Sequence, residues 1–224
     1  QAAAEKALDD PNMFVVQGWA PRAQTDALYA LAGKHVLGIT VETPAADEEP
    51  PTLLSNRGLA AGGQNAVSFY TTPAYRAWDP SGVVFFSFSI FFAMIMADAG
   101  YAVLLGIFLV LFWRRLGRSS GGLQQRKLFA AIVIASVVYG VVIGSYFGFP
   151  PPANWRLSQL HIIDAGNTSL MMRISIVIGV AHLVVANLAL AWSRRWSARM
   201  LSSLGWALVL LGGLGLGLAR SGTE

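Results

Sequence analysis

The sequence predicts a mainly α-helical polytopic membrane protein of about five membrane helices, with a partial α+β soluble segment at the N-terminus. The composition is the first observation: 54% of the residues are hydrophobic, 12% are charged and the mean hydropathy is +0.52, as in membrane proteins. The second is a series of long apolar runs in the later part of the chain. The third is that basic residues lie just outside those runs, where they orient membrane helices. The net charge of +4 therefore does not indicate a nucleic-acid partner.

The first 54 residues predict a partial α+β arm segment and a linker. Two stretches are rich in β-branched and aromatic side chains, which favour strands. Pro21 suits the first position of a helix. The expected order is the end of a helix over residues 1–13, a strand over 14–20, a helix over 22–31, a strand over 35–43, and an acidic, proline-rich linker up to residue 54.

Residues 55–81 form an aromatic, proline-containing approach to the membrane domain, which we place at 82–224. Its first apolar stretch, 82–113, carries a single formal charge, Asp98, near its middle. One crossing of a hydrocarbon core ~30 Å thick needs about 20 residues, so this stretch is too long for one upright helix. We predict two short helices, 82–97 and 100–113, that form a hairpin with its turn at Asp98. The alternative is one long, tilted helix that tolerates an acid.

Three more apolar runs predict the remaining membrane helices, at residues 128–149, 170–192 and 201–219. The loops 114–127 and 193–199 are basic and are expected in the cytoplasm. The loop 150–169 is then external, with an interfacial helical turn around 155–163. If the 82–113 stretch is a hairpin, the soluble segment also lies in the cytoplasm; if it is a single crossing, that segment lies outside.

Three side chains are candidates for an ion path or for a structural role. Asp98 is an acid at a membrane turn, and such acids are functional hypotheses by default; it could instead cap the helix that follows, by accepting backbone N–H bonds. His182 lies near the middle of its helix and could join a proton path, or could be a buried histidine bonded between helices. Tyr101 fits an interfacial or packing aromatic better than a proton relay.

Gly140, Gly144 and Gly148 recur at four-residue spacing, which predicts a small-residue face where another helix approaches closely. No catalytic residues are predicted, because the sequence contains no phosphate-binding loop, nucleophile elbow or paired catalytic carboxylates. No metal site or cofactor is predicted either: the chain has no cysteine, and His161 and Asp164 lack a third ligand.

Several short motifs, in the same order, resemble the membrane stator subunit of V-type ATPases, called subunit a in eukaryotes and subunit I in prokaryotes. The motifs, in chain order, are GWAP at 18–21, PTLLSN at 51–56, Phe69, PAY at 73–75, DP at 79–80, FFAMIMADAGY at 91–101, GSYFG at 144–148 and IGVAHL at 178–183. Each motif alone is weak, but their order across nearly the whole chain is specific. Ala93, Ala97 and Ala102 depart from the pattern, since the family usually has glycine there.

This resemblance implies a non-catalytic subunit of a rotary ATPase that moves protons or sodium ions. It implies a cytoplasmic arm on peripheral-stalk and central-stalk subunits, and a membrane domain in the lipid bilayer, here a prokaryotic plasma membrane, facing a ring of proteolipids. The essential arginine of that family would follow Glu224, so Arg173 is not assigned its role. Because the chain starts without Met and stops just after an apolar run, we expect it to be a piece of a longer protein. The alternatives are a free-standing transporter or channel using Asp98 and His182, and a purely structural anchor.

Overall fold

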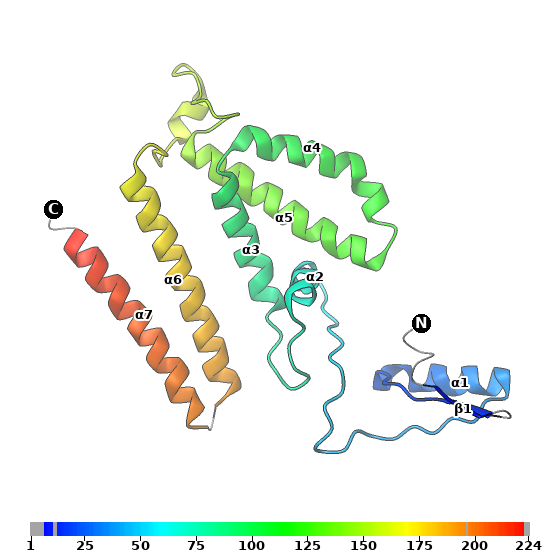
Figure 1. Cartoon of the computed structure of the whole chain (residues 1–224). Coiled ribbons are helices and arrows are strands. Elements are labelled where there is room, and N and C mark those ends of the chain that lie inside the picture. Colours follow the sequence, from blue (N-terminus) through cyan, green and yellow to red (C-terminus); the bar gives the residue numbers. More distant parts are fainter. Residues whose placement is uncertain (1–6, 11–12, 196, 222–224) are drawn as a thin grey trace. The chain divides into compact units, whose positions relative to one another are not determined.

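The computed structural model describes residues 7–10, 13–195 and 197–221. The chain divides into two compact units, one ending at Leu53 and the other beginning at Leu54. Each unit is described by itself; Figure 1 labels the α-helices and β1.

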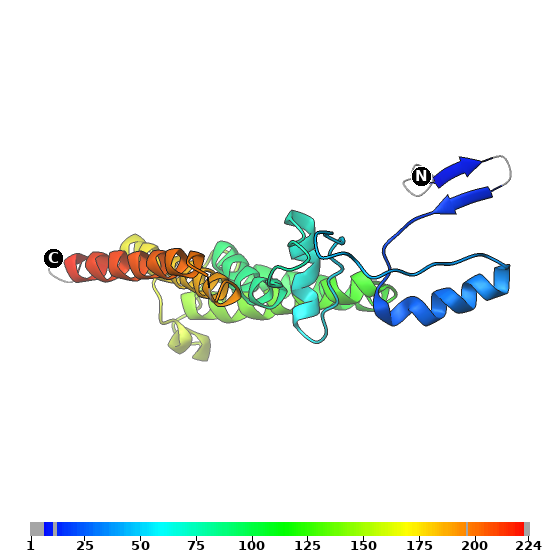
Figure 2. The same ribbon diagram turned by 90° about the horizontal axis from the view of Figure 1, so that it is seen from below.

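The described residues of the first unit form a two-stranded antiparallel pair and one α-helix. Its elements are β1 (Ala7–Asp10), β2 (Met13–Val16), a 3₁₀ turn, η2 (Arg22–Gln24), and α1 (Thr25–His35). Figure 2 shows the two strands as adjacent arrows. In their register, Ala7 pairs with Val16. Of residues 14–53 only Ala32 is buried, so this part of the chain builds no packed core of its own.

Two expectations for the first unit are wrong. Residues 1–13 were expected to hold the end of a helix, but the described residues among them include the strand β1. The strand expected over 35–43 does not form. Helix α1 continues through Gly33 to His35 and ends where Val36 takes the left-handed conformation, with φ of 53°. Strand preference depends on packing against a neighbouring strand, and the described chain offers residues 37–43 no such partner.

The second unit is helical. Its elements are α2 (Ala60–Tyr70), α3 (Ser81–Met96), α4 (Ala99–Leu116), α5 (Ser120–Ile143), η3 (Arg156–Leu160), α6 (Thr168–Ser193) and α7 (Arg199–Ser221). Four of them, α4 to α7, are long and apolar enough to cross a membrane, while α3 is a shorter apolar helix. Its 16 residues extend about 24 Å, less than the ~30 Å hydrocarbon core. The structure thus supports four candidate crossings rather than the expected five.

The apolar stretch around Asp98 is broken into two helices, so the alternative of one long, tilted helix is wrong. Helix α3 ends at Met96 because Ala97 takes a left-handed conformation with φ of 46°, and α4 begins at Ala99. The two helices do not pack on each other as a hairpin: each packs mainly on α5 (Figure 1). The interface between α3 and α5 is a row of buried residues at four-residue spacing on each helix, with Phe85, Leu128 and Ile132 as its core.

Helix α2 lies in the approach segment, where no helix was expected, and it contains Gly62 and Gly63, which are poor helix formers. Tertiary packing explains both glycines. A Cβ on Gly63 would overlap the carbonyl oxygen of Ser81, and one on Gly62 would lie 2.8 Å from the ring of Phe85. The absence of side chains therefore lets α2 pack closely against α3 and α5.

A polar junction fixes the approach segment to the start of α3. Asp79 accepts hydrogen bonds from the Asn56 side chain (2.6 Å) and from the Ser81 backbone and hydroxyl (2.9 and 2.6 Å). Gln64 of α2 accepts a bond from the Asn56 backbone and donates one to the carbonyl of Leu54. We call Asn56, Gln64, Asp79 and Ser81 the entry junction.

The entry junction lies at the same end of the unit as the basic α4–α5 loop. Lys127 donates to the carbonyl of Gly58 at 2.9 Å, and Asn65 donates to the carbonyl of Gly121 at 3.1 Å. Helix α3 starts at this end, and its C-terminus lies at the other end, beside Ser145. The chain therefore runs away from the basic loop along α3 and returns along α4.

The acid stability of the entry junction gives a first testable prediction. Burial raises the pKa of Asp79, but hydrogen bonds from Ser81 and Asn56 outweigh it and hold the pKa below its usual value. Since the folded state favours the carboxylate, its contribution is present above the unfolded pKa of about 3.9 and is lost as pH falls through the lower folded pKa. Asp79→Asn should cost about 1 kcal/mol at pH 6, and this difference from wild type should shrink towards pH 3. A difference in the free energy of unfolding that stays the same from pH 6 to pH 3 would contradict this prediction.

Candidate functional site: the Asp98 clasp

The carboxylate of Asp98 joins the start of α4 to the loop that follows α5. Its Oδ1 accepts from the backbone N–H groups of Tyr101 (2.9 Å) and Phe147 (3.0 Å). Its Oδ2 accepts from the hydroxyl of Ser145 (2.7 Å) and the backbone N–H of Gly148 (2.8 Å). Asp98 is only 5% exposed. Four donors match an ionised carboxylate, which is an acceptor at both oxygens. We call this arrangement the Asp98 clasp.

The local sequence explains the half of the clasp that lies on α4. Asp98 is the N-cap of α4, with extended backbone angles of −148° and 121°. Aspartate is among the preferred residues there, because its side chain accepts a bond from an N–H group in the first turn that has no partner within the helix. The backbone adds a second connection, since the N–H of Ala99 donates to the carbonyl of Ser145 at 2.8 Å.

The other half of the clasp is a tight turn at residues 146–149. Tyr146 and Phe149 exchange two backbone hydrogen bonds, and the central residues Phe147 and Gly148 have φ of 55° and 81°. Positive φ at both central residues is what a type I′ turn requires. This conformation is unusual for phenylalanine. It points two successive N–H groups of the turn at the same carboxylate.

The Phe147 ring covers the start of α4. It makes an edge-to-face contact with the ring of Tyr101, with centroids 5.2 Å apart. A Cβ on Gly100 would lie 2.6 Å from the Phe147 ring, so only glycine lets the ring sit there. Tyr101 thus contacts Phe147 through its ring and donates its backbone N–H to the clasp.

The three glycines do not form one helix face, which corrects the expected packing seam. Helix α5 ends at Ile143, not at residue 149, because Gly144 ends it in the left-handed conformation with φ of 71°. Gly148 belongs to the tight turn. Gly140 alone fits the expectation of close approach: it is buried in α5, and a Cβ there would overlap the backbone nitrogen of Ala99.

The structure does not bring His182 to Asp98. The half-buried His182 ring, on α6, makes an edge-to-face contact with Phe91 of α3, with centroids 5.3 Å apart. Phe91 lies about 7.5 Å along the axis from the end of α3 at Met96, and Asp98 follows the break at Ala97. The sequence reasoning also missed Ser145, Phe147 and Gly148 as partners of Asp98, although they lie in the GSYFG motif.

The clasp is suited to holding structure rather than to chemistry. Its carboxylate already has four donors, and no cationic side chain is among them. An ion-carrying carboxylate needs room to exchange its partner, whereas Asp98 ties together two segments 47 to 50 residues apart.

Comparisons with known proteins place the chain in a family. It is 36% identical over 154 residues to the V-type ATP synthase subunit I of Chlamydia trachomatis serovar D, covering 66% of this chain and 23% of that protein. It is 30% identical over 153 residues to the A-type ATP synthase subunit I of Archaeoglobus fulgidus, covering 68% of this chain and 22% of that protein. The chain belongs to the subunit I family of V-type and A-type ATP synthases.

A longer but weaker match extends the similarity over most of the chain. The A-type ATP synthase subunit I of Thermococcus kodakarensis is 23% identical over 233 residues, covering 94% of this chain and 34% of that protein. The matches to the chlamydial proteins cover 22% to 23% of those proteins, so the chain spans little more than a fifth of their length. No protein-family model matches the chain.

The subunit I assignment confirms the resemblance seen in the motifs, and the structure shows why two of them occur together. The segment at 91–101 carries Asp98 and the segment at 144–148 carries its hydrogen-bonding partners. The structure also explains the glycine that the family pattern has in place of Ala97: this residue ends α3 in a left-handed conformation, where glycine has no Cβ penalty.

Proposed function

We propose that this chain is a non-catalytic part of the membrane stator of a rotary V/A-type ATP synthase. It would link the arm to the membrane helices that brace the ion path against a proteolipid ring. The observation that carries the proposal is the entry junction. There, the segment arriving from the arm is hydrogen-bonded to α2 and to the start of α3, and α2 packs on both α3 and α5. A stator must resist torque, and such a junction transmits a load from the arm into three helices.

The proposal includes a topology. The basic loops at 114–127 and 193–199 favour the cytoplasmic side of a prokaryotic plasma membrane. The entry junction is bonded to the first of these loops, so the arm, which joins at Leu54, is expected in the cytoplasm. Helix α3 would enter the bilayer with α4 as a fifth membrane helix. Its short length can be met by local thinning of the bilayer.

The partners and the transported ion are inferred from the family. We expect peripheral-stalk and central-stalk subunits on the arm and a proteolipid ring beside the membrane helices, with protons or sodium ions as the transported species. The free-standing transporter finds less support, because Asp98 is held by four donors and His182 lies apart from it.

Co-purification tests the proposed function. The full-length protein, tagged and extracted from its native membrane in mild detergent, is expected to bring down proteolipid and stalk subunits in fixed ratio. Asn56→Ala with Asp79→Ala should loosen the link between arm and membrane, and so reduce ATP-driven ion pumping while ATP hydrolysis continues. A tagged protein that elutes alone and still transports ions would contradict the stator assignment.

A further inference from the structure

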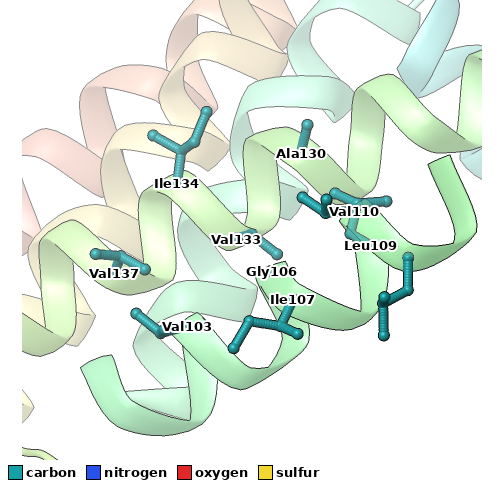
Figure 3. Close-up of a pocket in the computed structure, with 10 residues that line it drawn as sticks. Val103, Gly106, Ile107, Leu109, Val110, Ala130, Val133, Ile134 and Val137 are labelled. Atoms are coloured by element: carbon teal, nitrogen blue, oxygen red, sulfur yellow. The ribbon is translucent and has the colours of Figure 1, made fainter.

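An apolar groove of about 490 Å³ runs between α4 and α5. Figure 3 shows aliphatic side chains along both of its walls. Its lining includes Val103, Ile107 and Val110 of α4, and Val133, Ile134 and Val137 of α5. Gly106 lies in the groove, where a Cβ would be 3.1 Å from a methyl of Val133, so the helices approach closely there. Both helices are candidate membrane crossings, which places this groove against the bilayer interior.

A cluster of basic residues lies one helical turn beyond the groove lining, at the end of α4 and the start of α5. Arg114 follows Val110 by one helical turn on α4, and Arg126 precedes Ala130 by one turn on α5, so both share faces with the groove lining. Arg126 is held in place: its guanidinium lies 4.4 Å from the centre of the Trp113 ring. Arg114, Arg115 and Arg118 are exposed. Residues 114–127 contain no Asp or Glu to neutralise them.

We propose that the groove and its cationic end bind one anionic phospholipid. An acyl chain lies along the groove, and the phosphate group contacts Arg114, Arg115 and Arg118. The charge complementarity decides the occupant. A further membrane helix could cover the aliphatic walls, but it would not need a run of exposed arginines at the level of the headgroups. An anionic lipid accounts for these arginines, because each basic residue near the membrane surface is attracted to anionic headgroups.

The position of the cluster agrees with this occupant. Trp113 lies at the end of an apolar helix, where amphipathic rings locate at the level of the headgroups. The basic loop marks the cytoplasmic leaflet, whose anionic lipids give the surface a negative potential. The site does not depend on the stator role, since it requires only that α4 and α5 cross a membrane.

A local quenching experiment tests the site. The full-length protein in its complex carries a bimane fluorophore on Ile134→Cys, at a groove residue that is 65% exposed. It is reconstituted into vesicles of phosphatidylcholine containing a small fraction of brominated phosphatidylglycerol or brominated phosphatidylcholine. We expect phosphatidylglycerol to quench at about tenfold lower mole fraction. The control label on Leu208→Cys, an exposed site on α7, should respond equally to the two lipids.

Matched charge variants locate the headgroup. Arg114→Gln with Arg118→Gln should reduce the tenfold preference at position 134 to about twofold or less, because each arginine near the membrane surface contributes attraction to anionic lipid. Arg194→Gln with Arg195→Gln removes the same charge from the other basic loop and should leave the preference unchanged. Three results would overturn the proposal: equal quenching by the two lipids at position 134, no quenching by either, or equal effects of the two double variants. If a charge variant fails to fold, quenching by the two lipids in the protein with its native arginines still tests the proposal.

Discussion

Replacing Asp98 with alanine is expected to lower the free energy of unfolding of the membrane unit by about 3–5 kcal/mol. The change removes the N-cap of α4 and leaves four donors without their acceptor. Loss of a cap costs about 1 kcal/mol, and each buried donor left unpaired costs about 1–3 kcal/mol. Some of these donors regain a partner from water, which keeps the total below the full sum. Denaturant titration in detergent, followed by tryptophan fluorescence, measures the loss.

Asp98→Asn separates the structural role from ion handling. The amide keeps the shape of the side chain, but one of its two ends is an NH₂ group that faces donors instead of accepting from them. We expect it to destabilise almost as much as alanine. Asp164→Asn is the matched control, because that exposed carboxylate accepts from Gly166 within its own loop; its stability should change by less than about 0.5 kcal/mol. A stable Asp98→Asn variant that assembles but moves no ions would contradict the clasp.

Gly140→Leu is expected to separate α5 from the start of α4 and to destabilise the unit by about 3 kcal/mol or more. Even a Cβ at this position would overlap the backbone of Ala99, which has no flexible end that could move away. Overpacking of well-packed interiors costs about 1–3 kcal/mol, and here the displaced atoms also form the clasp. Gly140→Ala adds only the Cβ and should cost about 1 kcal/mol, the lower end of the range for overpacking.

The control for Gly140 is a glycine in the middle of another membrane helix. Gly179 of α6 has open space where a Cβ would be, so Gly179→Ala should be neutral or stabilising by up to about 1 kcal/mol. The same unfolding titration measures both variants. Equal responses at the two positions would show that the close contact between α5 and α4 contributes little to stability.

The helix positions were largely predictable because they depend on local signals. The break at Asp98 follows from an acid and a glycine inside an apolar run, and α6 and α7 follow from apolar length bounded by basic residues. The observed helix ends differ from the predicted ones where a single residue sets the end. Gly144 ended α5 early, and α1, which was expected to end at residue 31, continued to His35.

What could not be predicted depends on contacts distant in sequence. Nothing local shows that Asp98 pairs with a turn centred on Phe147 and Gly148, since the donors are backbone groups that every residue carries. Helix α2 forms because Gly62 and Gly63 pack against Phe85 and Ser81, a gain that helix propensity does not contain. The packing of α3 and α4 on α5, instead of on each other, likewise follows from the buried rows of small and apolar residues on three helices.

The out-and-back path of α3 and α4 is the claim on which the clasp, the entry junction and the stator role all depend. Because the chain has no native cysteine, single cysteines at positions 57, 118 and 154 can be labelled in oriented vesicles with a membrane-impermeant maleimide. We predict that positions 57 and 118 react from the same side and position 154 from the other. Reaction of positions 57 and 118 from opposite sides would contradict the account.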